Sequence, residues 1–154
     1  MPRQPRLDTP EILHHVMGRG LERRVTVRHL VVGGYAVAYH GYPRATDDLD
    51  VWVSPDLANA ERTFAAFRAF GFTATELSLE LFQHPSCLVR MGRPPLRIDV
   101  LTTISGVAFE TAYTRRVTAV IDGVEVDILG LEDLKSSKRA SGRLRDLADL
   151  DELP

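Results

Sequence analysis

The feature that most constrains this chain is an apolar strand pattern that begins with two acids, Asp48-Leu49-Asp50-Val51-Trp52-Val53. Successive side chains of a strand point to opposite faces, so Asp48 and Asp50 should share one face. Two like charges so close together repel each other, and beside an apolar run they also lose hydration. A divalent cation would relieve both costs, and Mg²⁺ usually binds one or two carboxylates together with substrate phosphates. The pattern therefore predicts a β-sheet with a magnesium site on one face.

A third acid and a glycine pair fit the same chemistry. Asp99 lies in the apolar run 97–101, so its carboxylate needs a partner other than the hydrophobic core. Gly33-Gly34 follows an apolar strand, and the missing side chains would let a phosphate approach backbone N–H groups at a helix N-terminus. Each feature alone has a simpler explanation: a turn or capping acid, a tight turn, or an aspartate on an edge strand. Their ordered combination favours a site for a metal and a nucleotide.

Hydrophobic periodicity and turn residues predict an alternation of helices and strands. The predicted order is a helix from Thr9-Pro10-Glu11 onward, a strand at 25–32, a short helix at 35–40, a strand at 49–53, a helix at 54–70, strands at 87–91 and 96–101, a hairpin of 117–121 and 124–128 around Asp122-Gly123, and helices over 131–153 with a break near Gly142. The segment 73–84 receives no assignment. We expect one α+β domain over residues 1–154, a mixed β-sheet with helices packed mainly on one face, and a flexible segment 1–8.

Composition limits the classes of function. With 154 residues the chain is long enough for one hydrophobic core, and its net charge of -2 argues against wrapping a phosphate backbone. Cys87 is the only cysteine. It excludes an intrachain disulfide, fits a reducing compartment, and is expected to be a small core residue. No stretch resembles a signal peptide or reaches the roughly 20 apolar residues of a membrane span. We therefore expect a cytoplasmic protein with no membrane partner.

The finer motif resembles a known family. The glycine pair, the Asp-x-Asp and the later aspartate are together similar to the signature of the DNA-polymerase-β-like nucleotidyltransferase superfamily. The longer pattern Gly-Gly-x-Ala…His-Gly-x-x-Arg-x-Thr-x-Asp-x-Asp, from Gly33 to Asp50, is similar to that of small bacterial members, among them the lincosamide nucleotidyltransferases and the abortive-infection nucleotidyltransferase toxins. The stretch 138–150 also resembles their closing segment, so the resemblance spans residues 30–150. It implies a nucleotidyltransferase-like fold.

The resemblance also implies an activity: transfer of a nucleoside monophosphate from an NTP to an acceptor hydroxyl, with two Mg²⁺ or Mn²⁺ ions. The implied catalytic and metal-binding residues are Asp48 and Asp50, which would bridge both ions, and Asp99, which would hold the catalytic ion and help to activate the hydroxyl. The implied nucleotide-binding residues are Gly33, Gly34, Arg44, Thr46, Lys138 and Arg143.

Several of these cations have a structural alternative. Arg44 could contact a phosphate or form an ion pair with the acids. Lys138 and Arg143 could contact the nucleotide or belong to a solvated, charged helix. Asp146 and Asp149 lie three residues apart, so they could orient Arg143 or Lys138 rather than bind metal.

The acceptor stays open: a tRNA end, a protein side chain or a small molecule. Little of the chain remains to bind it, which favours a homodimer, a partner protein such as an antitoxin, or a macromolecular acceptor such as a tRNA end or a protein side chain. A role in a toxin–antitoxin system fits the family. An arginine-rich segment, residues 3–28, could steer an anionic acceptor or be a solvated helix face. Two other functions remain: a catalytically silent NTP-binding or antitoxin interaction module on the same fold, and a phosphohydrolase that uses the same metals.

Overall fold

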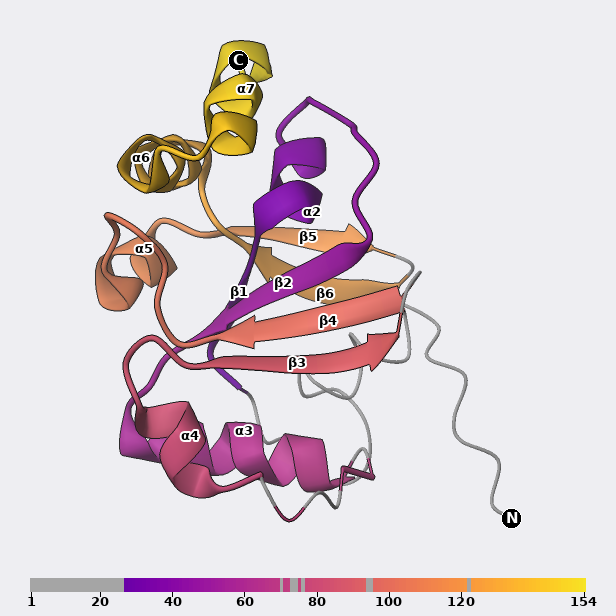
Figure 1. Ribbon diagram of the computed structural model, residues 1–154, viewed down its shortest axis with the longest axis vertical. Helices are drawn as coiled ribbons and strands as arrows, with labels where there is room; N and C mark the ends of the chain where they lie inside the picture. Colours follow the sequence, from indigo (N-terminus) through magenta and orange to yellow (C-terminus); the bar gives the residue numbers. More distant parts are fainter. Residues whose placement is uncertain (1–26, 70, 73–74, 76, 94–95, 122) are drawn as a thin grey trace.

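Figure 1 shows the computed structural model, which describes residues 27–154 except 70, 73–74, 76, 94–95 and 122. The elements in chain order are β1 (His29–Val32), α2 (Gly33–Tyr39), β2 (Asp48–Val53), α3 (Leu57–Ala69), α4 (Leu79–Gln83), β3 (Leu88–Arg93), β4 (Leu96–Leu101), α5 (Phe109–Thr114), β5 (Val117–Ile121), β6 (Val124–Ile128), α6 (Leu131–Ser141) and α7 (Leu144–Glu152). The helix predicted from Thr9, the segment 1–8 and most of the arginine-rich segment lie outside the described residues.

The strands form one six-stranded mixed sheet in the order β3-β4-β2-β1-β6-β5. In its interior, β2 pairs antiparallel with β1 and parallel with β4, and β1 pairs parallel with β6. The outer strands β3 and β5 pair antiparallel with β4 and β6. A central strand with a parallel neighbour is covered on both faces, which explains why residues 51–53 of β2 are all apolar and buried. The predicted fold class, a mixed sheet of the α+β class, is confirmed.

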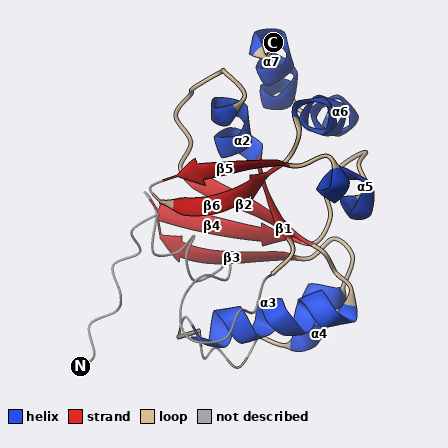
Figure 2. Cartoon of the chain, turned by 180° about the vertical axis from the view of Figure 1, so that it is seen from behind, coloured by secondary structure: helices blue, strands red, loops and turns tan. Residues whose placement is uncertain are grey.

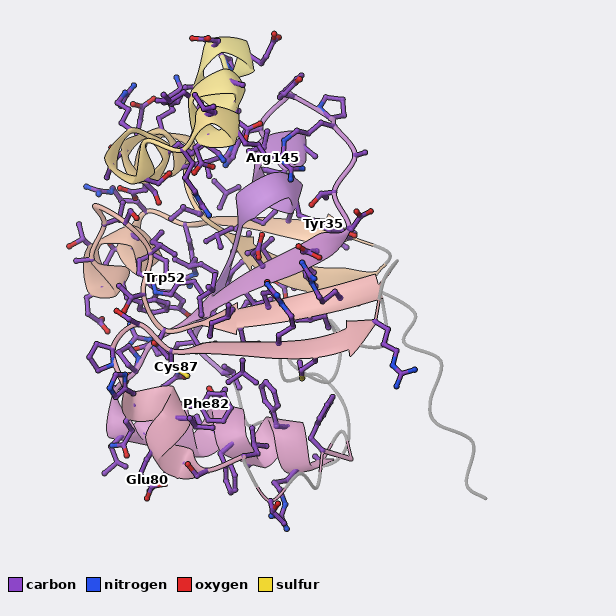
Figure 3. All side chains as sticks on the ribbon, in the orientation of Figure 1. Tyr35, Trp52, Glu80, Phe82, Cys87 and Arg145 are labelled. Carbon is purple, nitrogen blue, oxygen red and sulfur yellow. The ribbon has the colours of Figure 1, made fainter. Side chains whose placement is uncertain are left out.

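All the described helices except α5 form two groups around the sheet. In Figure 1, α2, α6 and α7 lie above the sheet and α3 with α4 below it, and Figure 2 shows this arrangement from behind. Trp52, on the same face of β2 as the two acids, packs edge-on against Phe109 of α5 with ring centroids 5.0 Å apart. On the other side, Phe82 of α4 meets Phe67 of α3 at 5.0 Å. Figure 3 shows Phe82 on the sheet side of α4 and Glu80 on the opposite side. None of the described helices is both long and apolar enough to span a membrane.

Most predicted elements are present, and some bounds need correction. The strand at 96–101 and both strands of the hairpin have their predicted bounds, although Asp122 of the turn is outside the described residues. The short helix begins at Gly33 instead of Tyr35, so the glycine pair forms its first turn rather than a loop before it. Gly142 ends α6 in the left-handed conformation, with φ of 65°, which confirms the predicted break.

Two short helices were not predicted. α4 falls in the segment 73–84, which received no assignment. α5 buries only Phe109 and Ala112 of its six residues, which is too little of a pattern to show helical periodicity.

A buried asparagine ties α3 to the ends of two strands. The side-chain oxygen of Asn59 accepts a hydrogen bond from the Arg28 N–H at 2.7 Å. Its amide nitrogen donates to the Ser54 carbonyl at 2.8 Å and to the Arg28 carbonyl at 3.1 Å. Asp56 accepts a hydrogen bond from the backbone N–H of Asn59 at 2.9 Å and so caps the helix. Asn59 thus satisfies backbone groups just before β1 and just after β2.

We expect Asn59→Ala to lower the free energy of unfolding by about 2–4 kcal/mol, because buried backbone groups would lose their partners. Urea denaturation followed by circular dichroism measures the loss. Glu61→Ala, at an exposed position of the same helix, is the matched control and should change stability by less than about 0.5 kcal/mol. Equal stability of the two variants would contradict the structural role of Asn59.

Candidate active site

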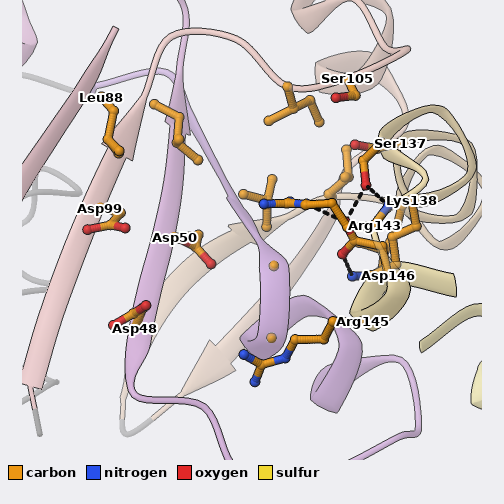
Figure 4. A pocket seen from close by; sticks show the side chains of 18 of the residues that line it. Asp48, Asp50, Leu88, Asp99, Ser105, Ser137, Lys138, Arg143, Arg145 and Asp146 are labelled. Atoms are coloured by element: carbon orange, nitrogen blue, oxygen red, sulfur yellow. Dashed lines mark hydrogen bonds and ion pairs between the residues drawn. The ribbon is translucent and has the colours of Figure 1, made fainter. Parts of the chain in front are cut away.

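The three predicted acids lie side by side on two neighbouring strands. Asp48 and Asp50 share one face of β2, and Asp50 stands directly opposite Asp99 of β4. Figure 4 shows the three side chains on one side of a pocket, with Lys138 and Arg143 on the other side. The parallel pairing of β2 with β4 brings the third acid to the Asp-x-Asp pair, and it confirms that the three positions predicted from the sequence converge.

Asp50 is the acid whose charge is least compensated. Among the described residues, no hydrogen bond or ion pair reaches its carboxylate. Burial, together with the nearby charges of Asp99 and Asp48, raises the pKa of Asp50 to about 6, against an opposing effect of Arg143 and Lys138. Its ionised form is therefore costly at neutral pH, and a bound cation would remove that cost.

Two arginines that the sequence did not single out compensate the other acids. Arg90 of β3 donates from Nε and Nη2 to the two carboxylate oxygens of Asp99, each at 2.9 Å. Arg97 of β4 donates to Asp48 at 2.5 Å, and its Nε lies 3.8 Å from an oxygen of Asp99. Each arginine stands directly across a strand pair from the acid that it binds. Cross-strand register creates these ion pairs, so only a prediction of that register could have found them.

The acid cluster offers the oxygen donors that Mg²⁺ or Mn²⁺ prefers, and Asp50 supplies uncompensated negative charge. As the side chains stand, within the part of the chain that the structure describes, no group of three or more His, Cys, Asp or Glu residues surrounds a common point that could hold a metal ion. Asp48 and Asp99 are engaged with Arg97 and Arg90 instead. The donor set therefore fits a divalent cation, but its binding by all three acids requires the ion pairs of Asp48 with Arg97 and of Asp99 with Arg90 to rearrange.

The first turn of α2 lies against the acids. Gly33 has φ of +62°, and a Cβ added there would lie 2.1 Å from Oδ2 of Asp50. A Cβ at Gly34 would lie 2.6 Å from Oγ1 of Thr46, whose hydroxyl donates to the Asp48 carbonyl oxygen at 3.2 Å. The glycine pair therefore allows α2 to approach the acid strand and the segment before it, a structural need in addition to its predicted contact with phosphate.

A buried ion-pair cluster forms the opposite wall. Lys138 of α6 is 5% exposed and donates to Asp146 at 3.0 Å and to Asp149 at 2.7 Å. Arg44 adds two hydrogen bonds to Asp149, at 2.7 and 2.9 Å, and Arg143 donates to Asp146 at 2.8 Å. The alternative of a solvated helix is thus wrong for Lys138, and the orienting role considered for Asp146 and Asp149 is confirmed. Arg44 pairs with Asp149 rather than with the acids of the sheet.

A pocket of about 840 Å³ joins the acids, α2 and this cluster. Its lining includes every site residue predicted from the sequence: Asp48, Asp50, Asp99, Gly33, Gly34, Arg44, Thr46, Lys138 and Arg143. Leu88, Leu101 and Ile104 add an apolar wall. Cys87, expected in the core, is half-buried and also lines the pocket, because it directly precedes the edge strand β3. The volume lies within the range of about 300–1,000 Å³ that is usual for small-molecule sites.

Comparison with known proteins identifies a similar fold but no family. No protein-family model matches the chain, and no curated protein matches it. Among solved structures it is similar to the crystal structure of a Thermotoga maritima protein described as a "putative nucleotidyltransferase". The two have a TM-score of 0.59 and 14% sequence identity, over 94% of this chain and 88% of the other. At this identity the likeness shows a nucleotidyltransferase-like fold.

We expect Asp50→Asn to stabilise the metal-free protein at pH 8 and to lose that effect near pH 4. Because the pKa of Asp50 is raised to about 6, its ionisation begins to destabilise the fold above the unfolded-state pKa, close to 4, and the cost is complete above about pH 6. The difference between the folded-state and unfolded-state pKa values of Asp50 limits the gain in the free energy of unfolding to about 3 kcal/mol. Urea unfolding in EDTA at both pH values measures it. Asp47→Asn, at an exposed neighbouring position, is the control, and a gain that persists at pH 4 would contradict the prediction.

We expect Lys138→Met to lower the free energy of unfolding by about 3–5 kcal/mol, because it leaves two buried carboxylates without their shared cation. Burial alone would raise the pKa of Asp149, but hydrogen bonds from Arg44 and Lys138 outweigh it and hold that pKa below its usual value. Arg139→Met, at the next and exposed position of α6, should change stability by less than about 0.5 kcal/mol. Thermal unfolding compares the two variants. An equally small effect of Lys138→Met and Arg139→Met would contradict the prediction, because the buried acids would then not depend on the Lys138 ammonium group.

Proposed function

We propose that this protein is a metal-dependent nucleotidyltransferase that transfers a nucleoside monophosphate from an NTP to an acceptor hydroxyl. The observation that carries the proposal is that one pocket collects the three acids, the glycine-led start of α2 and a basic cluster. These are the parts that such a transfer needs: a place for cations, a place for phosphates and compensation for developing charge. The similarity of the fold to that of the Thermotoga maritima structure supports the same class of activity.

In this reaction the acceptor oxygen attacks the α-phosphorus of the NTP, the bond to the bridging oxygen of the β-phosphate breaks, and pyrophosphate leaves. Asp48 and Asp50 would hold the divalent cations, and Asp99 would hold the catalytic one and help to take up the hydroxyl proton. When bound, Mg²⁺ or Mn²⁺ neutralises the triphosphate and the charge on the leaving pyrophosphate.

Phosphate binding falls to the other residues of the pocket. Gly33 and Gly34 would present backbone N–H groups to the β- and γ-phosphates, and Thr46 lines the same side. Arg143, whose side chain is 79% exposed, is the predicted cation with most freedom to reach a phosphate. Lys138 and Arg44 are already bound to buried acids, so in this proposal they contribute mainly positive potential to the pocket.

The acceptor and partners belong to the same proposal. An acceptor hydroxyl on a tRNA end, a protein side chain or a small molecule would fit the chemistry. A homodimer or an antitoxin partner would supply the surface that binds it, and a toxin–antitoxin system would be the setting.

A catalytically silent NTP-binding or antitoxin module on the same fold is the second candidate. One observation favours it: Arg90 and Arg97 occupy two of the three acids, as they would in a site that binds no metal. Turnover separates the two functions, because a silent module would bind an NTP without releasing pyrophosphate.

We expect NTP binding to require Mg²⁺ or Mn²⁺, because three carboxylates alone would repel a triphosphate. Isothermal titration with each NTP, in Mg²⁺ and in EDTA, tests this requirement. Asp50→Asn should weaken Mg²⁺-dependent binding, while Asp47→Asn, which removes the same charge at an exposed position, should bind as the unmodified protein does. Equal affinity in Mg²⁺ and EDTA would contradict the metal-dependent mechanism.

A further inference from the structure

The ion pair between Arg90 and Asp99 joins a fixed acid to a cation that can leave. The side chain of Asp99 is 7% exposed, whereas that of Arg90 is 51% exposed. Arg90 uses both carboxylate oxygens of Asp99, one through Nε and one through Nη2. An exposed guanidinium can turn toward solvent at little cost, since ion pairs at the surface contribute weakly to stability. Asp99, in contrast, is held by its place inside the sheet.

Arg97 differs from Arg90 in this respect. Its side chain is 26% exposed, and its Nε is buried without a hydrogen-bond partner in the part of the chain that the structure describes. It lies between two acids, bound to Asp48 and 3.8 Å from Asp99. Arg97 is therefore enclosed in the acid cluster, and Arg90 is the arginine placed to move.

A divalent cation at Asp99 would meet the guanidinium of Arg90 on the same two oxygens. The cation and the guanidinium are both positively charged, so binding of one to the Asp99 carboxylate weakens binding of the other. An anionic ligand in the pocket would change this balance, because a displaced guanidinium on the pocket wall gains a new partner in a phosphate.

Building on the proposed function, we propose that Arg90 is a positioning residue that holds Asp99 in the metal-free protein and competes with the divalent cation for its carboxylate. Cation binding at Asp99 then depends on the triphosphate, which accepts the displaced guanidinium. The coupling is reciprocal, so the cation also raises the affinity for the triphosphate. Without the cation, Arg90 and Arg97 compensate Asp99 and Asp48 but not Asp50, and the site becomes complete when both ligands are present.

Titration of Mn²⁺ without nucleotide, followed by the electron paramagnetic resonance signal of free Mn²⁺, tests the competition directly. Removal of the competing charge by Arg90→Gln should tighten Mn²⁺ binding by about two- to fivefold, the range expected for loss of an exposed ion pair. Arg90→Lys keeps the charge but loses the two-point contact, and it should give an intermediate affinity. Arg93→Gln removes the same charge from an exposed position at the end of β3, where no ion pair with the three acids is seen among the described residues, and it should change the affinity much less.

The outcomes separate this inference from the proposed function. If Asp50→Asn weakens Mn²⁺ binding but Arg90→Gln leaves it unchanged or weakens it, the metal site stands and the competition is overturned. An equal gain from Arg93→Gln would also overturn it, since a general change of potential would then explain the effect. If neither the unmodified protein nor Arg90→Gln binds Mn²⁺ without nucleotide, the competition is overturned, whereas the metal-dependent function fails only if NTP binding is also equal in Mg²⁺ and EDTA.

Discussion

The crowding of three carboxylates on one face of two adjacent strands is the constraint on which the rest of this structure depends. The parallel register of β2 and β4 fixes Asp50 beside Asp99. A shift of this register by one residue would move every side chain of one strand to the opposite face of the sheet, so a change of register cannot relieve the repulsion between the two acids. The chain instead places an arginine across the sheet from each of two acids and leaves the third without a partner among the described residues. The electrostatic cost that remains at Asp50 is the cost that a cation would remove.

In the acid wall arginines compensate acids, whereas in the opposite wall of the pocket the buried cation Lys138 is compensated by acids. There a lysine is buried between two acids of the following helix, and the left-handed Gly142 turns α7 so that Asp146 and Asp149 reach Lys138. This arrangement compensates Lys138 within the basic wall, whereas Arg143 and Arg145 line the pocket with exposed side chains. Most charges of the acid wall and of the basic wall are paired within their own wall. The uncompensated charge of Asp50 and the exposed guanidinium of Arg143 are the ones that a metal-bound triphosphate would satisfy.

Much of the site could be predicted because its residues lie in local patterns. Alternation along β2 indicated that Asp48 and Asp50 share a face, and Gly142 was predicted to break the last helical segment. The remainder depends on contacts between segments far apart in the sequence. Nothing near Arg90 indicates that it faces an acid until the register of β3 and β4 is known. A lysine on a polar helix also looks exposed until the next helix brings its acids, which is why the burial of Lys138 was not predicted.

The most direct test of the central claim is to follow label from an α-phosphate. Each NTP, labelled at that position, is incubated with the protein, Mg²⁺ and bulk cellular RNA and protein, and both macromolecules and pyrophosphate are then analysed. The account predicts label joined covalently to one acceptor class, with release of pyrophosphate, and loss of both with Asp50→Asn. NTP binding without transfer or pyrophosphate release would contradict it in favour of a silent module, and labelled nucleotide released into water would identify a phosphohydrolase.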